Sequence, residues 1–144
     1  MNGTKADMER EFKASIIPWL REEGFKGSFP HFRRPGQSAF DLLTFQFDRH
    51  GGGYVIEIAQ CPAEGIVTHW GKAISAREAK AWDVHSSRRK RICGDSKPGT
   101  EGWFRFDQTP PKQLAALTIA KLSDATIWLE LGPLAQPDKL HLPR

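Results

Sequence analysis

Residues 50–53, with the sequence HGGG, form a short motif that resembles catalytic machinery. In lipases and esterases a motif of this kind directs backbone amides at the negative charge that develops during ester hydrolysis. That chemistry also needs a serine on a G-x-S-x-G turn, and this context is missing at Ser75, Ser86, Ser87, Ser96 and Ser123. The motif is therefore more typical of a glycine turn that joins two β-strands.

Two cysteines and two histidines have the chemistry of zinc ligands, in the order Cys61, His69, His85 and Cys93. Structural zinc sites usually hold paired ligands about two to five residues apart, because one turn then delivers both. Here each cysteine stands eight positions from its histidine, so the spacing argues against a metal site. The sequence also has no glycine-rich phosphate loop and no dinucleotide fingerprint. We therefore expect no metal and no cofactor.

Residues 88–91, the basic cluster, are Arg88, Arg89, Lys90 and Arg91, and they supply the entire formal net charge of +4. The 21 Lys and Arg less these four equal the 17 Asp and Glu, so the rest of the chain is electrically balanced. Nucleic-acid-binding proteins usually present a broader cationic face, and no exposed aromatic platform is expected beside this cluster. We favour an edge strand whose charges discourage aggregation, with a phosphate-backbone contact as the alternative.

Polar residues on several expected strands would share one face of a sheet. Gln46, Glu57 and Arg105 would point away from the apolar side, and a strand through the basic cluster would add Arg89 and Arg91. A solvated face held by cross-strand ion pairs accounts for this pattern. The alternative is a groove for an anionic or peptide ligand, and it makes these five residues the candidate ligand-binding site.

The elements that would position these side chains begin with a β-hairpin, which is the strongest local signal. AFDLLTFQFD and GYVIEIAQ are rich in strand-forming residues and are joined by RHGGG. Thr44 would lie on the face opposite the apolar core, where an aspartate should be tolerated. Alternation places the large apolar residues of both strands on the core face: Leu43, Phe45, Phe47, Tyr54, Ile56 and Ile58.

Helices are expected before and after the strands in the sequence. The apolar spacing of residues 4–23 predicts an amphipathic helix with a kink or break at Pro18. Residues 112–131 predict a long helix, or two joined near Ser123, that starts beside Pro111 and stops at Gly132. Residues 28–34 and 102–106 read as further strands, and the alanine-rich residues 70–82 suggest a short helix.

Length and composition fit a single globular domain spanning residues 1–144, with residues 133–144 as an extended tail. The chain is 39% hydrophobic and 26% charged, which lies in the globular range. Two cysteines are too few for a disulfide framework and suit a reducing compartment. The charged N-terminus does not resemble a signal peptide, and no apolar run is long enough to cross a bilayer. A cytoplasmic protein without a membrane partner is expected.

Several short motifs then occur in an order seen in a known family: EEGF, FPHFRR, DLLTFQFDRHGGGYVIEIA, HSSRRKRI, GWFRF and WLEL. Over roughly residues 8–131 the chain resembles a bacterial family catalogued as domain of unknown function 4304. The matching motifs are structural in character. The resemblance therefore implies no catalytic or ligand-binding role for any residue.

Taken together, the patterns predict an α+β fold: an antiparallel sheet of four or five strands with an N-terminal helix and a C-terminal helical segment packed on one face. The predicted function is a small cytoplasmic, non-catalytic binding or protein-interaction module whose partner is a protein or a small anionic ligand. The alternative is a nucleic-acid-associated protein that uses the basic cluster. A hydrolase with an unrecognised site is a third hypothesis.

Overall fold

A computed structural model describes residues 3–36, 38–94 and 102–132. The predicted extended tail, residues 133–144, lies outside them. No helix in these three ranges is long and apolar enough to cross a membrane. The elements follow in this order: α1 (Lys5–Glu11), η1 (Phe12–Ile16), α2 (Ile17–Glu22), β1 (Lys26–Ser28), β2 (His31–Pro35), β3 (Ala39–Phe47), β4 (Gly53–Pro62), β5 (Ile66–Val67), β6 (Ala73–Ile74), η2 (Ala81–Asp83), η3 (Ser86–Arg88), β7 (Arg89–Ile92), β8 (Phe104–Arg105) and α3 (Pro111–Glu130).

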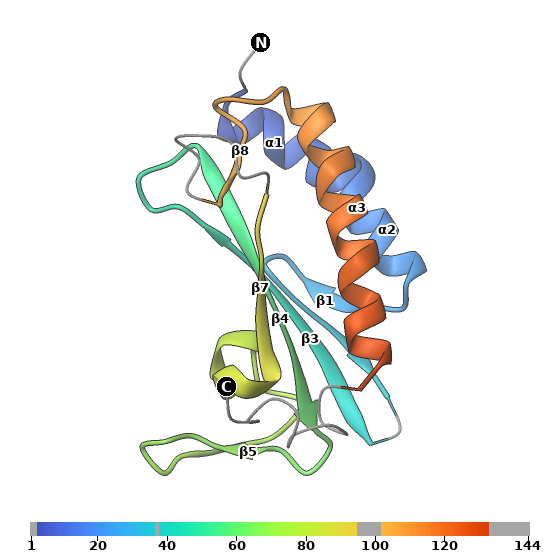
Figure 1. The fold of residues 1–144 in the computed structure, drawn as a ribbon, viewed down its shortest axis with the longest axis vertical. Coiled ribbons are helices and arrows are strands. Elements are labelled where there is room, and N and C mark those ends of the chain that lie inside the picture. The colour runs from blue at the N-terminus through green and yellow to red at the C-terminus, as the bar shows by residue number, and fades with distance from the viewer. Residues whose placement is uncertain (1–2, 37, 95–101, 133–144) are drawn as a thin grey trace, which may run out of the picture.

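The strands form an antiparallel sheet in the order β1-β2-β3-β4-β7, and β8 pairs with the start of β4. Within the described ranges this sheet has six strands, and β5 and β6 form a separate two-stranded hairpin. The three α-helices lie on one side of the sheet, and the segment between β4 and β7 lies on the other (Figure 1). The predicted α+β fold is confirmed: an antiparallel sheet has an N-terminal and a C-terminal helix packed on one face. The sheet has six strands in the described ranges, where the sequence predicts four or five, because β1 and β8 are only three and two residues long.

Just before Pro18, where the sequence predicts a kink or a break, the N-terminal helix changes its winding without interruption. Residues Phe12–Ile16 form a π-helical turn, in which the Ile17 N–H donates to the Phe12 carbonyl. Proline has no N–H, and its ring clashes with the carbonyl one turn earlier in a regular α-helix. A wider turn before Pro18 relieves that clash, so the apolar stripe continues from α1 into α2.

The β3–β4 hairpin carries the main core. Its register pairs Phe45 with Ile56, and the two residues are 2% and 0% exposed, which confirms the predicted apolar face. The buried Tyr54 hydroxyl lies 2.7 Å from Thr118 Oγ1 on α3, so the helix is anchored to the sheet by a polar contact as well as by packing. Residues from helices and sheet meet in this core: Met8, Phe12, Ile16, Leu20, Leu43, Phe45, Tyr54, Ile56, Ile58, Phe104, Phe106, Leu114, Leu122 and Leu129.

The prediction that Thr44 faces solvent is wrong. Thr44 is 0% exposed, and its Oγ1 lies 2.9 Å from His31 Nδ1 on the neighbouring strand. The chain that follows β4 folds back over part of this side of the sheet (Figure 1). An aspartate at position 44 would therefore bury a charge and should destabilise the fold.

The predicted helix over residues 70–82 is also wrong. That region contains β6, a turn and the short 3-10 helix η2. Arg33 on β2 donates to the carbonyls of Ala76 and Ala79 at 3.0 and 3.4 Å, and this holds the segment against the sheet. The alanines are small enough for the backbone to approach closely, so they build a second core rather than a helix. This core consists of Leu42, Ala59, Cys61, Ala76, Ala79, Ala81 and Val84.

The C-terminal helix is one continuous element, α3, not two joined near Ser123. Pro111 occupies its first turn, where a missing N–H has no consequence. Gly132 has a positive φ of 77°, and its N–H donates to the Leu129 carbonyl at 3.0 Å. That geometry favours glycine and explains why the helix stops at the predicted place.

Candidate functional site

The side of β3, β4 and β7 that faces away from the helices forms the polar face, and its centre is Glu57. The register places Glu57 opposite Arg91. Arg91 Nε lies 2.7 Å from one carboxylate oxygen of Glu57, and Arg89 Nε lies 3.4 Å from the other. The Glu57 side chain is only 8% exposed, whereas those of Arg89 and Arg91 are 29% and 52% exposed. One nearly buried carboxylate is thus shared by two guanidinium groups.

Gln46 joins this face on β3. Gln46 pairs with Val55, and Thr44, two residues earlier on β3, pairs with Glu57. Gln46 therefore lies diagonally across from Glu57. Its side chain is half-buried. The structure therefore brings together Gln46, Glu57, Arg89 and Arg91, four of the five residues that the sequence analysis named.

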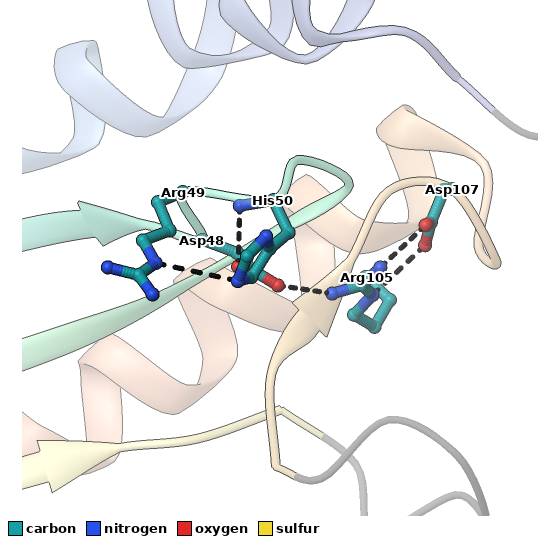
Figure 2. A network of polar contacts seen from close by, with 5 residues as sticks. All are labelled: Asp48, Arg49, His50, Arg105 and Asp107. Carbon is teal, nitrogen blue, oxygen red and sulfur yellow. Dashed lines mark hydrogen bonds and ion pairs between the residues drawn. The ribbon is translucent and has the colours of Figure 1, made fainter.

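Arg105, the fifth, is engaged elsewhere. It pairs with Gly53 at the start of β4 and bonds to two carboxylates (Figure 2). Its Nη1 donates to Asp48 at 3.0 Å, and its Nε and Nη2 donate to Asp107 at 3.1 and 2.6 Å. A Cβ on Gly52, where φ is +83°, would lie 2.6 Å from Arg105 Nη2, so glycine makes room for this network. Arg105 holds the hairpin turn to β8.

Hydrogen bonds, and then charges, shift the pKa values of Asp48 and Arg105 in this network. The backbone N–H of His50 and the Arg105 guanidinium lower the pKa of Asp48 below its ordinary value. The hydrogen bonds to Asp107 raise the pKa of Arg105. The HGGG motif is thus the glycine turn that the sequence favoured, with the Asp48 N–H donating to the Gly53 carbonyl at 2.9 Å.

Beside the polar face lies a groove of about 270 Å³, which we name the tryptophan groove. It runs between the β5–β6 hairpin and the η2–η3 turns. Trp70 and Trp82 on its walls are 63% and 47% exposed. Its polar lining includes His69, Asp83, His85, Ser86 and Arg89. A second groove of about 430 Å³ shares both tryptophans and adds Lys72 and Lys80.

Arg89 connects the groove to the polar face. Its Nη1 donates to the Trp82 carbonyl at 2.7 Å, while its Nε faces Glu57. The Trp82 ring stands perpendicular to His31, with ring centres 4.9 Å apart. Burial and the nearby Lys80 charge lower the pKa of His31. The position of Trp82 is therefore fixed by contacts from both the sheet and the basic cluster.

His85 has a defined tautomer in this groove. The Ser87 backbone N–H donates to His85 Nδ1 at 3.1 Å. Because a backbone N–H acts only as a donor, Nδ1 has no proton, and neutral His85 carries its proton on Nε2. The side chain therefore presents a hydrogen-bond donor on its other nitrogen.

The basic cluster is divided, as alternation predicted for Arg91 and Lys90. Arg91 reaches Glu57 on the polar face, while Lys90 Nζ lies 5.9 Å from the centre of the Trp128 ring on α3. Arg88 belongs to η3 instead of the strand. Its Nε is buried. Among the buried side-chain nitrogen and oxygen atoms of the described residues, it alone has no hydrogen-bond partner.

The prediction that no exposed aromatic platform adjoins the cluster is wrong, because Trp70 and Trp82 provide one. The sequence pattern predicts Trp82 at the end of a helix over residues 70–82, whereas the structure places it in the short 3-10 helix η2. The sequence signal for the β5–β6 hairpin is short: the strand-forming pair Ile66 and Val67, followed by Gly71. In the structure Gly71 has a φ of +89°, which favours glycine. Strands of two residues are too short for alternation to reveal.

The residues considered for zinc do not converge. Cys61 is buried in the second core, and burial with the nearby Glu64 charge raises its pKa to about 11. His69 and His85 line the tryptophan groove, and Cys93 is half-buried beyond β7. In the part of the chain that the structure describes, no three His, Cys, Asp or Glu side chains are grouped to hold a metal ion.

Fold and site together define an α+β protein with an ion-paired polar face beside an aromatic groove. The family model described as "Domain of unknown function (DUF4304)" matches residues 16–130. This is well over half of the 144 residues, so the chain belongs to that family. The predicted resemblance is confirmed, while the bacterial source stays a prediction. Neither the curated proteins nor the solved structures contain a match to the chain.

Proposed function

We propose that this protein is a non-catalytic binding module whose ligand is anionic. The observation that supports this most directly is the tryptophan groove beside Arg89. Two large aromatic side chains stay exposed there, although burying them would be favourable. Binding sites commonly combine such apolar walls with a few oriented polar groups.

The charge of the polar face supports an anionic ligand. Arg89 and Arg91 share the single carboxylate of Glu57, which leaves one positive charge uncompensated within this group. Arg88 directly precedes Arg89 in η3 and has no part in this ion-paired group, so the surplus charge comes from Arg89 and Arg91. A surplus charge on a partly desolvated surface attracts anions more strongly than the same charge in open water.

A solvated face held by ion pairs is the simpler explanation of Glu57, Arg89 and Arg91. It does not account for Trp70 and Trp82, because an ion-paired surface needs no exposed indoles beside it. A structural role also predicts that removing Glu57 only weakens the protein. A binding role predicts in addition that removing Glu57 strengthens anion binding.

The cellular context follows the same proposal. Both cysteines are free, which suits a reducing compartment and hence a cytoplasmic module. We also propose that residues 1–144 act as one domain. The second core supports this, because Leu42 and Ala59 on the central strands pack directly against the segment that forms the groove.

The test uses thermal midpoints in the presence of three probes: inorganic phosphate, adenosine monophosphate and a polyglutamate peptide. A bound probe raises the midpoint by mass action. We expect at least one probe to raise it, Arg89→Ser and Trp70→Leu to reduce that rise, and Glu57→Gln to increase it at low salt. Lys112→Ser and Ile127→Ser are the controls, because both residues are exposed on the helical side of the molecule.

Equal behaviour of the groove variants and the two controls with every probe would contradict the proposal. The same conclusion would follow if Glu57→Gln lowered the response as Arg89→Ser does. In that case the ion pairs would serve stability alone.

A further inference from the structure

We infer that the anion is a single-stranded nucleic acid, with bases stacked on Trp70 and Trp82 and phosphates held by Arg89 and Arg91. This inference rests on the proposed function and names its ligand class. It also reverses the order of the sequence hypotheses, in which a nucleic acid ranked below a protein or a small anion.

The two indoles have the properties of a stacking platform. Each is held by a perpendicular contact with a histidine: Trp70 with His69 at 4.7 Å and Trp82 with His31 at 4.9 Å between ring centres. These contacts restrain the rings, yet 63% of Trp70 and 47% of Trp82 remain exposed. Stacking of bases on aromatic side chains is tolerant of sequence, because every base has a π-face.

The cations lie where a chain of phosphates would pass. Arg89 and Arg91 are two positions apart on β7, so they lie on the same face about 6.6 Å apart along the strand. Arg89 is bonded to the Trp82 carbonyl, which places one guanidinium directly beside one platform. A base on Trp82 would therefore have its backbone close to Arg89.

The second groove extends the same surface past the tryptophans. Lys72 and Lys80 line it, together with the acids Glu78 and Asp83. Asp83 already accepts the Lys80 backbone N–H at 2.8 Å, and Glu78 accepts the Ser75 hydroxyl at 3.1 Å. These neutral donors leave both carboxylates charged, so the second groove is electrically balanced. Lys72 and Lys80 can still donate to individual phosphates of a strand that crosses both grooves, which a single small anion would not reach.

Other anionic macromolecules fit this surface less well. A nucleic-acid duplex keeps its bases stacked on each other, so it offers no base faces to Trp70 and Trp82. An acidic peptide would use the arginines and leave the indoles without a matching group. The combination of aromatic and cationic side chains thus favours the single strand.

The experiment measures fluorescence anisotropy of a labelled 12-nucleotide mixed-sequence RNA, and its DNA equivalent, with the full chain at several salt concentrations. We expect Trp70→Leu and Trp82→Phe each to weaken binding, by about fivefold or more for Trp70→Leu. Arg89→Ser and Arg91→Ser should each weaken binding and reduce the slope of log K against log salt by about 0.7. Trp70→Leu should leave that slope unchanged, because it removes no charge.

Ile127→Ser and Lys112→Ser serve again as apolar and cationic controls. Trp70 is the more exposed indole, so its variant is expected to keep the fold even if Trp82→Phe does not. Binding of the single strand that is unaffected by Trp70→Leu, or a duplex of the same sequence that binds equally well, would overturn the inference.

Failure of this inference can be told apart from failure of the proposed function. If polyglutamate binds the groove and responds to Arg89→Ser while the oligonucleotides do not, the module binds anions and the single strand is the wrong class. If neither the oligonucleotides nor any of the three anionic probes responds to a groove variant, both proposals fail.

Discussion

At the scale of single residues, Glu57 organises the polar face through two unequal ion pairs. Arg91 lies closer to it than Arg89 does, at 2.7 against 3.4 Å. Arg88 lies two residues from Lys90 in the chain but has no part in this arrangement. Neighbouring cations in one cluster therefore have different structural roles, which substitution can separate.

We expect Arg91→Ala to lower the free energy of unfolding by about 1 kcal/mol, because Glu57 then keeps only the longer contact. Arg88→Ala should cost less than about 0.5 kcal/mol, since Arg88 makes no ion pair within the described residues. Urea unfolding followed by circular dichroism measures both. A larger loss in Arg88→Ala would show that its buried Nε has a partner that matters more than Glu57.

His31 should make stability depend on pH. Its pKa lies below the ordinary histidine value, first because burial disfavours the charged ring and second because Lys80 repels it. The unfolded chain then binds the proton more readily than the folded one. Stability is therefore fully present above a pH of about 6.5 and declines as the pH falls below that value.

The measurement compares thermal midpoints at pH 7.5 and 5.5. We expect the wild-type midpoint to fall more than that of His31→Gln, by a difference of less than about 4 °C. A glutamine amide keeps a hydrogen-bonding group near Thr44 without titrating. An identical fall in both proteins would show that His31 does not titrate differently on folding.

At the scale of elements, the Arg105 network ties the β3–β4 turn to β8. Arg105→Met keeps the aliphatic part of the side chain but leaves Asp48 and Asp107 without their shared cation. We expect a loss of about 1–3 kcal/mol in the free energy of unfolding. Arg49→Met is the matched control, because Arg49 is exposed and its one hydrogen bond within the described residues goes to its neighbour His50, at 3.4 Å. Equal losses in the two variants would contradict the role of the network.

Elements formed by contacts between residues close in sequence could be predicted, and elements formed by contacts between distant residues could not. The β3–β4 hairpin and both terminal helices were predicted because alternation, glycine turns and proline positions are local signals. The alanine-rich segment was not, because Ala79 is buried by contact with the sheet and with Arg33, not by its neighbours in sequence. Its composition favours a helix only when that tertiary contact is ignored.

The candidate site divides in the same way. Gln46, Glu57, Arg89 and Arg91 were found because strand alternation places them on one face once the strands are known. The tryptophan groove was missed because Trp70 and Trp82 come together only when two irregular segments fold over the second core. No periodic pattern in the sequence indicates that Trp70 and Trp82 lie close together.

At the scale of the whole molecule, the central strands separate two cores. Leu42 and Leu43 are consecutive residues of β3, yet Leu43 belongs to the helical core and Leu42 to the second core. A strand presents alternate residues to opposite faces, so β3 contributes side chains to both cores. Unfolding of β3 would therefore disrupt both cores together. The groove that rests on the second core is therefore expected to share the stability of the helical core.

Cys61 offers a direct test, because it is 0% exposed inside the second core and burial raises its pKa to about 11. Both effects make the native thiol slow to react, since the thiolate is the nucleophile. In a Cys93→Ser variant Cys61 is the remaining thiol, so brief labelling along a urea series reports the opening of the second core alone. We expect the labelling midpoint to coincide with the midpoint of helix loss seen by circular dichroism, as a single cooperative unit requires. Labelling at distinctly lower urea would show instead that the groove segment opens while the helices and sheet remain folded, and that residues 1–144 do not unfold as one domain.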